Sequence, residues 1–187
     1  MTLTPIVAIY LLWIAWVVSW FAAGRWTNAP AKQLPRRRER AHLLVTAAGL
    51  LVVFAPANRL VLWSPSEATG WLLFALAAVS FGFCWWARIV MGRLWAPLVS
   101  RTADHRIIDS GPFGIVRHPI YTGLIGAALA TAAARGQATA LIGVALAAFG
   151  FWVKARLEEA FLRDQLGAEA YDAYARRVPM LIPFGPR

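Results

Sequence analysis

A polar loop near the middle of the chain, residues 105–123, separates two apolar stretches. Its end reads Arg117-His118-Pro119, and Pro119 suits the first turn of a helix, where the missing N–H would lack a partner in any case. The free N–H groups and the positive dipole end of a helix N-terminus favour an anionic ligand group. The pattern therefore predicts that Arg117 and His118 bind such a group. Spacing alone supports equally well that Arg117 reaches lipid phosphate and that Tyr121 is an interfacial anchor.

A second polar cluster follows the last apolar stretch and begins at Lys154. Lys154 and Glu158 are four residues apart and share one face of a helix, whereas the adjacent Glu158 and Glu159 point about 100° apart. We therefore expect at most one of the two glutamates to face a given site. The alternative interpretation is an amphipathic helix on the membrane surface, in which Lys154 and Glu158 form an exposed pair.

Several common site signatures are missing from the sequence. It has no glycine-rich phosphate loop with Lys-Ser or Lys-Thr, no G-x-G-x-x-G and no G-x-S-x-G, which disfavours a Rossmann nucleotide site and a serine hydrolase. The three histidines, His42, His105 and His118, have no spacing that brings two of them onto one helix face, so we predict no metal site. The single cysteine, Cys84, lies in an apolar run and is expected to be a small buried hydrophobe.

The composition places these residues in a membrane protein. Of the 187 residues, 59% are hydrophobic and 15% are charged, against about half and about a quarter in soluble domains. This excludes an ordinary soluble globular protein. The formal net charge is +10, but the basic residues flank apolar stretches instead of forming one solvated face. Anionic membrane lipids are therefore the expected partner, and nucleic acid is not.

The apolar stretches predict an all-α integral membrane protein with about five transmembrane helices. They cover residues 3–23, 41–63, 70–90, 119–134 and 137–153. The first stretch is expected to remain as an anchor, since no Lys or Arg precedes its long apolar run. Pro56 should kink or end the second stretch, and Arg135 and Gly136 should form a tight turn between the last two. We expect a single membrane domain, 1–187, with N-terminal spans in 1–100 and a functional core in 101–187.

The positions of the basic residues predict the orientation of the chain. Seventeen of the 19 Lys and Arg residues fall between the first and second stretches, between the third and fourth with Arg88 at the end of the third included, or after the fifth. The positive-inside rule then places the N-terminus outside and the C-terminus in the cytoplasm, with both polar clusters on the cytoplasmic face. The predominance of arginine over lysine and the abundance of alanine favour a bacterial protein, and with it the bacterial inner membrane.

The two polar clusters together resemble the isoprenylcysteine carboxyl methyltransferase family of small integral membrane enzymes, which are related to phospholipid methyltransferases. The resemblance covers about residues 101–183. The residues that carry it are Arg117, His118, Pro119, Tyr121 and Gly123, followed by Glu158 and Glu159. It implies a cytoplasmic pocket for the cofactor S-adenosylmethionine, formed by the loop and the C-terminal helices and open sideways to lipid. The cofactor-binding residues that it implies are His105, Arg106, Ile107, Ile108, Phe113, His118, Pro119, Ile120, Tyr121 and Glu158.

The same resemblance indicates three candidate catalytic residues. The family's substrate-contacting arginine, four residues before the glutamate, corresponds to Lys154 here, and lysine lacks the bidentate fork that arginine offers a carboxylate. Arg156 is a candidate substitute on a different helix face, and Arg117 is the third candidate. Because the cofactor carries a sulfonium, a carboxylate and an ammonium group, an acid, a base and an aromatic wall such as Glu158, Arg117 and Phe113 suit it.

The expected reaction is methyl transfer to a lipophilic acceptor, first of all the carboxylate of a prenyl or other lipid-like molecule. Such a carboxylate is already ionised at neutral pH, so positioning and exclusion of water can supply most of the catalysis and no general base is needed. The alternative is N-methylation of an ethanolamine phospholipid, which requires a base such as His105, His118 or a glutamate. An NADPH-dependent membrane reductase and a non-enzymatic lipid-binding scaffold are two further alternatives.

Overall fold

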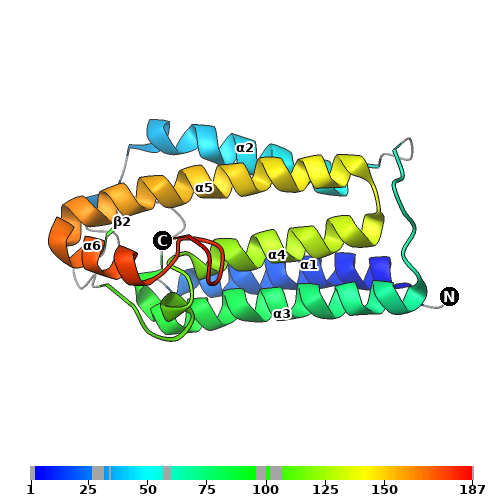
Figure 1. Cartoon of the computed structure of the whole chain (residues 1–187), viewed down its shortest axis with the longest axis horizontal. Helices are drawn as coiled ribbons and strands as arrows, with labels where there is room; N and C mark the ends of the chain where they lie inside the picture. Colours follow the sequence, from blue (N-terminus) through cyan, green and yellow to red (C-terminus); the bar gives the residue numbers. More distant parts are fainter. Residues whose placement is uncertain are drawn as a thin grey trace.

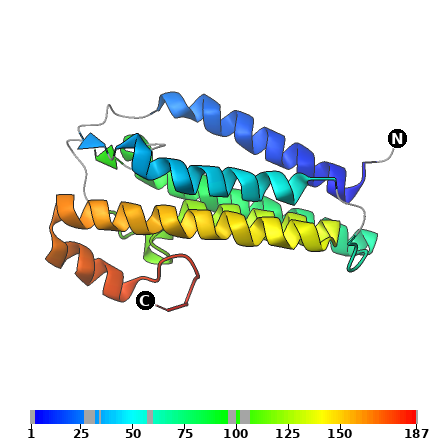
Figure 2. The same ribbon diagram turned by 90° about the horizontal axis from the view of Figure 1, so that it is seen from above.

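The computed structural model describes residues 3–26, 32–33, 35–56, 60–95, 100–101 and 107–186. Within them, α-helices lie roughly along one common direction, and the short last helix folds back beside one end of the bundle (Figures 1 and 2). These helices are α1 Pro5–Ala22, α2 Arg36–Phe54, α3 Glu67–Met91, α4 Pro119–Arg135, α5 Ala138–Leu166 and α6 Ala168–Arg177. The predicted all-α class is confirmed.

Short elements lie at the end of the bundle where α1 and α3 finish. The single-turn 3₁₀ helices are η1 Ala23–Arg25, η2 Gly92–Leu94 and η3 Gly111–Gly114. Two antiparallel strands, β1 Lys32–Gln33 and β2 Ser100–Arg101, pair with Lys32 opposite Arg101. This small ladder brings the segment after α1 beside the segment after α3.

Among the described residues, three helices are long and apolar enough to cross a membrane: α1, α3 together with η2, and α5. Many of their outward side chains are apolar, and Val18, Val79 and Phe149 are 63%, 71% and 54% exposed. The chain is therefore an integral membrane protein, as its composition predicts. The stretches 41–63 and 119–134 also contain helices, but α2 is apolar only over Arg40–Phe54 and α4 has 17 residues.

Helix α2 ends at Phe54, within the apolar stretch, as Pro56 predicts. Ala55 has an extended backbone (φ −59°, ψ 133°), the conformation favoured before a proline, and Pro56 has no N–H to continue the helix. Residues 57–59 lie outside the described part of the chain. Beyond them, the backbone N–H of Leu62 donates to the carbonyl of Gly136 at 2.7 Å, which ties this connection to the α4–α5 turn.

The turn between α4 and α5 is a tight hairpin, as predicted. Gly136 has a φ of 62°, and a Cβ at this position would lie 1.9 Å from the carbonyl oxygen of Trp63. Only glycine fits there. Arg135 holds the neighbouring helices to this hairpin, because its guanidinium donates to the Tyr10 hydroxyl at 2.6 Å and to the Phe54 carbonyl at 3.3 Å.

Helices α2 and α5 pack antiparallel with their backbones in close approach. A Cβ added at Gly49 would lie 2.3 Å from the backbone nitrogen of Ala147, and one at Gly143 would lie 2.5 Å from that of Val53. Small residues at helix contacts allow such an approach, which is typical of membrane helices. Gly150 repeats the pattern one step further along α5. The first half of α5 therefore packs closely against α2.

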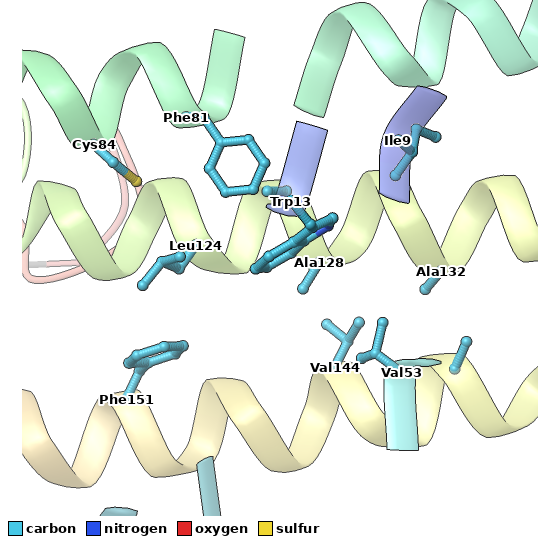
Figure 3. Packing of buried hydrophobic residues seen from close by; sticks show 12 residues of the cluster. Ile9, Trp13, Val53, Phe81, Cys84, Leu124, Ala128, Ala132, Val144 and Phe151 are labelled. Atoms are coloured by element: carbon cyan, nitrogen blue, oxygen red, sulfur yellow. The ribbon is translucent and has the colours of Figure 1, made fainter. Parts of the chain in front are cut away.

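The hydrophobic core lies between α1, α3, α4 and α5, and Val53 of α2 also belongs to it (Figure 3). Trp13 is its central ring: it packs edge-on against Phe81 at 4.8 Å, and its indole N–H donates to the hydroxyl of Thr131 at 2.9 Å. Cys84 is fully buried in this core, which confirms the prediction of a small buried hydrophobe. A Cβ at Gly123 would lie 2.5 Å from the Cys84 sulfur, so α3 and α4 also touch closely.

Helix α5 is longer than the apolar stretch that predicts it. It does not end at Val153 but continues to Leu166, and Gly167, with a φ of 97°, ends it. The apolar span and the second polar cluster therefore belong to one continuous helix. This continuity places Lys154 and Glu158 beside the start of α4.

Candidate active site

A cavity of about 490 Å³ lies at the end of the bundle where α1 and α3 end and α4 begins. Most of its lining is apolar or aromatic, and these side chains include Trp16, Trp20 and Phe21 of α1, Trp95, Leu124 of α4 and Phe151 of α5. Its polar side chains come mainly from the start of α4 and the second half of α5. Tyr171 and Tyr174 of α6 also line it.

Most residues proposed from the sequence meet at this cavity. The described cofactor candidates that line it are Ile107, Ile108, Phe113, His118, Pro119, Ile120, Tyr121 and Glu158. His105 and Arg106 lie outside the described residues. Of the three candidate catalytic residues, Lys154 and Arg117 line the cavity. Arg156 does not, and it lines a separate hollow between α5 and α6.

Glu158 is the centre of the polar side of the cavity. Its Oε1 accepts a hydrogen bond of 2.6 Å from the Tyr121 hydroxyl, and its Oε2 lies 3.4 Å from Nδ1 of His118. Nζ of Lys154, one helical turn earlier, lies 3.9 Å from Oε1. The carboxylate is thus oriented by groups from two helices.

The rings around Glu158 form a stack. The His118 and Tyr121 rings are 5.4 Å apart and nearly parallel, and the Phe151 ring follows at 5.3 Å from Tyr121. Lys154 places its ammonium group 5.4 Å from the centre of the Tyr121 ring. Such a distance is within the range of cation–π attraction, so the face of this tyrosine attracts positive charge.

Glu159 faces away from the cavity and forms the hollow's wall with Arg117. Its Oε1 accepts from Nε of Arg117 at 2.7 Å and lies 3.2 Å from Nε2 of His118. The expectation that one glutamate faces the site is therefore met by Glu158, while His118 touches both. Arg117 also donates to the carbonyls of Ala175 and Val178. Its guanidinium mainly joins the start of α4 to the end of α6.

The segment after α6 runs alongside the start of α4. The backbone N–H groups of Arg117 and His118 donate to the carbonyls of Pro179 and Met180 at 2.9 and 3.1 Å. The Thr122 hydroxyl donates to a further carbonyl in this segment. Two of the N–H groups expected to meet an anionic ligand are therefore satisfied by the protein itself.

The environment of His118 favours its charged form. Burial alone lowers the pKa of the imidazole, but hydrogen bonds and charge interactions with Glu158 and Glu159 outweigh burial and raise the pKa above its ordinary value of 6.5. A protonated ring donates from both nitrogens, which suits one carboxylate on each side. The two carboxylates thus favour positive charge on His118, which lies between the cavity and the hollow.

Sequence reasoning missed the contribution of α1 to the cavity. Trp16 and Trp20 stack with their centres 4.9 Å apart, and Trp20 meets the edge of Trp95 at 5.4 Å. The signal was present, because Trp13, Trp16 and Trp20 are spaced three and four residues apart and share one helix face. The first apolar stretch is therefore both a membrane helix and an aromatic wall of the cavity.

Arg88 supports this wall from inside the protein. It is fully buried, and its guanidinium donates to the carbonyls of Ala23, Trp26 and Gly92. The guanidinium carbon lies 4.5 Å from the centre of the Trp95 ring. Arg88 was expected with the basic residues between the third and fourth stretches, whereas in the structure it is buried in α3 and joins the ends of α1 and α3.

Within the described residues, no group of three or more His, Cys, Asp or Glu side chains is placed to hold a metal ion. Around the acid Glu158, the polar groups at the cavity are an imidazole, an ammonium and a phenol, and aromatic rings lie beside them. The sequence profile of the isoprenylcysteine carboxyl methyltransferase family matches residues 71–164, half of the chain. The chain belongs to this family.

The chain is similar to proteins from a yeast, a plant and a bacterium. The chain is 33% identical over 104 residues to Protein-S-isoprenylcysteine O-methyltransferase of Schizosaccharomyces pombe, covering 54% of this chain and 43% of that protein. It is 30% identical over 101 residues to Protein-S-isoprenylcysteine O-methyltransferase B of Arabidopsis thaliana, covering 52% and 51%. It is 31% identical over 100 residues to the cobalt-zinc-cadmium resistance protein CzcN of Cupriavidus metallidurans, covering 50% and 43%. The chain spans about half the length of these relatives.

The region matched to the isoprenylcysteine carboxyl methyltransferase family contains the polar side of the cavity. It runs from the beginning of α3 to near the end of α5, and it includes His118, Tyr121 and Glu158. The aromatic wall of α1 and the tyrosines of α6 lie outside it. The family region thus carries the charged groups, and flanking helices complete the apolar enclosure.

Proposed function

We propose that this protein transfers a methyl group from S-adenosylmethionine to a lipophilic acceptor, whose reactive group is the carboxylate of a prenyl or other lipid-like molecule. The observation that carries the proposal is the cavity, in which Glu158, His118 and Lys154 occupy one side of an otherwise apolar and aromatic enclosure. Membership of the family supports the methyltransferase class. The names of the yeast and plant relatives support a prenylated acceptor.

The residues at the cavity suit the cofactor. Its volume of about 490 Å³ lies in the range of about 300–1,000 Å³ found for small-molecule sites. Glu158 would receive the cofactor's ammonium group, and the rings of Tyr121 and Phe151 would face its sulfonium. The indole N–H of Trp16, a residue that also lines the cavity, is buried and has no hydrogen-bond partner within the described residues. When bound, S-adenosylmethionine supplies a methyl group activated by the positive sulfur.

Lys154 is the residue that we assign to the acceptor. A carboxylate is ionised at neutral pH, so the ammonium of Lys154 can hold it without any proton transfer. The role of the protein is then to align the carboxylate with the methyl group and to exclude water. The rings of Trp16 and Trp20 supply an apolar surface for a prenyl or acyl chain.

The geometry favours a carboxylate acceptor over an ethanolamine amine. An amine must lose a proton before it attacks, so it requires a free base. His118, however, lies between Glu158 and Glu159, which favour its charged form, and Glu158 already accepts from Tyr121. These groups are suited to binding charge and poorly suited to accepting a proton.

We also propose that the cavity opens on the cytoplasmic side of a bacterial inner membrane. Among the described residues, exposed arginines such as Arg93, Arg156 and Arg176 lie at the end of the bundle that holds the cavity. Arg135 lies at the other end, and its guanidinium donates to the Tyr10 hydroxyl. By the positive-inside rule, this distribution supports an external N-terminus and five spans that include the shorter helices α2 and α4.

The test is isothermal titration of the detergent-purified protein with S-adenosylhomocysteine, with NADPH as the comparison ligand. We expect saturable micromolar binding of S-adenosylhomocysteine alone. Glu158→Gln and His118→Ala should weaken it, and Glu169→Gln, on the exposed surface of α6, is the matched control. Unchanged affinity in both cavity variants would refute the site assignment, and binding of NADPH alone would indicate the reductase. Binding of neither ligand by folded protein would indicate a lipid-binding scaffold.

The acceptor is tested separately by methyl-transfer assays with farnesylcysteine analogues, long-chain carboxylates and phosphatidylethanolamine. Methyl ester formation on a carboxylate substrate is the expected result. Methylation of phosphatidylethanolamine alone would contradict the acceptor assignment and leave the cofactor assignment intact.

A further inference from the structure

The outer face of α5 carries an apolar stripe that the described part of the chain leaves exposed. Ile142, Phe149 and Trp152 are spaced seven and three residues apart, so they share one helix face, and they are 55%, 54% and 46% exposed. Phe149 and Trp152 stack on each other at 5.8 Å. At 1.5 Å per residue this stripe is about 15 Å long, which equals one leaflet of a hydrocarbon core about 30 Å thick. The stripe is therefore as long as the acyl-chain region of one leaflet.

The same face becomes basic where the stripe ends. Arg156 follows Trp152 by one helical turn, and Arg163 lies two turns further on. Both line the hollow of about 620 Å³ between α5 and α6, which Arg117 and Arg176 also line. The described lining contains four arginines against two acidic residues, Glu159 and Asp172. The hollow therefore has a surplus of positive charge.

The two acidic residues are already engaged. Glu159 is paired with Arg117 at 2.7 Å, and Asp172 accepts two parallel hydrogen bonds of 2.8 Å from Arg163. Arg156 and Arg176 are both exposed, and neither forms an ion pair within the described part of the chain. Their planar guanidinium groups are suited to bidentate contact with a phosphate. Charge complementarity at the hollow thus calls for an anionic group.

We propose that this face of α5 binds an anionic phospholipid. One acyl chain lies along Ile142, Phe149 and Trp152, and the phosphate occupies the hollow beside Arg156 and Arg176. Trp152 lies between the two parts, at the level where aromatic side chains meet lipid headgroups. The continuity of apolar stripe and basic hollow identifies a lipid, because a soluble phosphate compound would use only the hollow.

This lipid site is separate from the substrate cavity but shares a wall with it. Lys154 and Glu158 face the cavity, whereas Arg156 and Glu159 face the hollow. Of the described lining residues, Arg117 and Tyr171 are shared by both. A headgroup in the hollow would therefore hold α6 against α5 next to the cavity. The proposal does not depend on the methyl transfer proposed for the cavity.

Fluorescence quenching by brominated lipids tests the proposal directly. The protein is placed in phosphatidylcholine nanodiscs that contain a small fraction of phosphatidylglycerol, with brominated chains on one lipid or the other. The chain has 10 tryptophans, so the contribution of Trp152 is the part of the quenching that is present in the wild-type protein and absent in Trp152→Phe. For the wild-type protein we expect brominated phosphatidylglycerol to quench this fraction more strongly than an equal amount of brominated phosphatidylcholine.

The decisive variant is Arg156→Ala combined with Arg176→Ala, and the matched control is Arg37→Ala combined with Arg93→Ala, which removes two exposed arginines elsewhere. The first pair should lower the apparent preference for phosphatidylglycerol by about tenfold or more, and the control should retain it. Equal preference in both double variants would overturn the site. Loss of the preference on adding millimolar inorganic phosphate at constant ionic strength would show that a free anion is the true ligand, and would overturn the lipid assignment.

Discussion

The hydroxyl of Tyr121 donates a 2.6 Å hydrogen bond to the carboxylate of Glu158 and so joins the first turn of α4 to the second half of α5, across 37 residues of sequence. The neighbouring His118 stacks on the Tyr121 ring at an interplanar angle of 7° and contacts the other oxygen of the same carboxylate. Glu158 is therefore oriented chiefly by side chains of a different helix. The position of α4 relative to α5 decides whether the cavity can bind a cationic group.

Removing the Tyr121 hydroxyl should weaken ligand binding without unfolding the protein. In Tyr121→Phe the ring stack remains, but Glu158 loses a charge-assisted hydrogen bond, and we expect the affinity for S-adenosylhomocysteine to fall about tenfold. Titration calorimetry measures this change. Tyr10→Phe is the control, since it removes a hydroxyl that contacts Arg135 at the opposite end of the bundle. An equal loss of affinity in both variants would contradict a local role for Tyr121.

The ion pairs of His118 should make the stability of the protein depend on pH. Its folded-state pKa is raised above 6.5, so the folded state binds this proton more tightly than the unfolded state. The resulting stabilisation is complete below about pH 6.5 and is lost as the pH rises through the folded-state pKa. Thermal unfolding in detergent should therefore show a midpoint that decreases over this pH range. His118→Asn should lack this decrease, and an identical pH profile for both proteins would show that another group causes it.

Replacing Arg88 should loosen the ends of α1 and α3. Lysine keeps the charge but cannot reach three separate carbonyls or present a flat face to Trp95. We expect Arg88→Lys to lower the free energy of unfolding by about 1.5–3 kcal/mol and to weaken cofactor-analogue binding as well. Arg93→Lys, at an exposed position five residues later, should change stability by less than about 0.5 kcal/mol. Denaturation in mixed micelles measures the free energy of unfolding of both variants. Equal losses in Arg88→Lys and Arg93→Lys would show that the burial of Arg88 is unimportant.

The contact between α2 and α5 should tolerate no side chain at its centre. Gly49→Ala would force a Cβ against the backbone of α5, and overpacking of this kind costs about 1–3 kcal/mol. Gly82→Ala, in the middle of α3, meets nothing within 4 Å and should instead stabilise the protein by about 0.5–1 kcal/mol. Opposite shifts of the unfolding midpoint are expected. Shifts of the same sign would mean that the two helices separate easily.

The sequence predicts helices well where apolar residues run unbroken between polar ones. Helices α1 and α3 lie within a few residues of the predicted stretches, and the end of α2 follows from the chemistry of Pro56. The end of α5 could not be predicted from hydropathy, because a helix continues into polar sequence until a residue such as Gly167 ends it. Hydropathy measures contact with lipid, whereas helix length depends on backbone hydrogen bonding.

The candidate site was predictable in its composition but not in its pairing. Local spacing shows that Glu158 and Glu159 point in different directions, but the rotation of α4 against α5 decides which one meets Arg117. The roles of Trp16 and Trp20 were hidden for a related reason. An apolar face of a membrane helix has the same composition whether it contacts lipid or another helix.

The unbroken course of α5 has a mechanical consequence. A single continuous helix connects the hairpin at Gly136, at one end of the bundle, with Lys154 and Glu158 near the other end. Membrane helices respond to a thicker or thinner hydrocarbon layer by changing their tilt, and a change of tilt in α5 moves both charged groups relative to His118 and Tyr121. Lipids of different chain length should therefore alter the rate of the proposed methyl transfer without contacting the cavity.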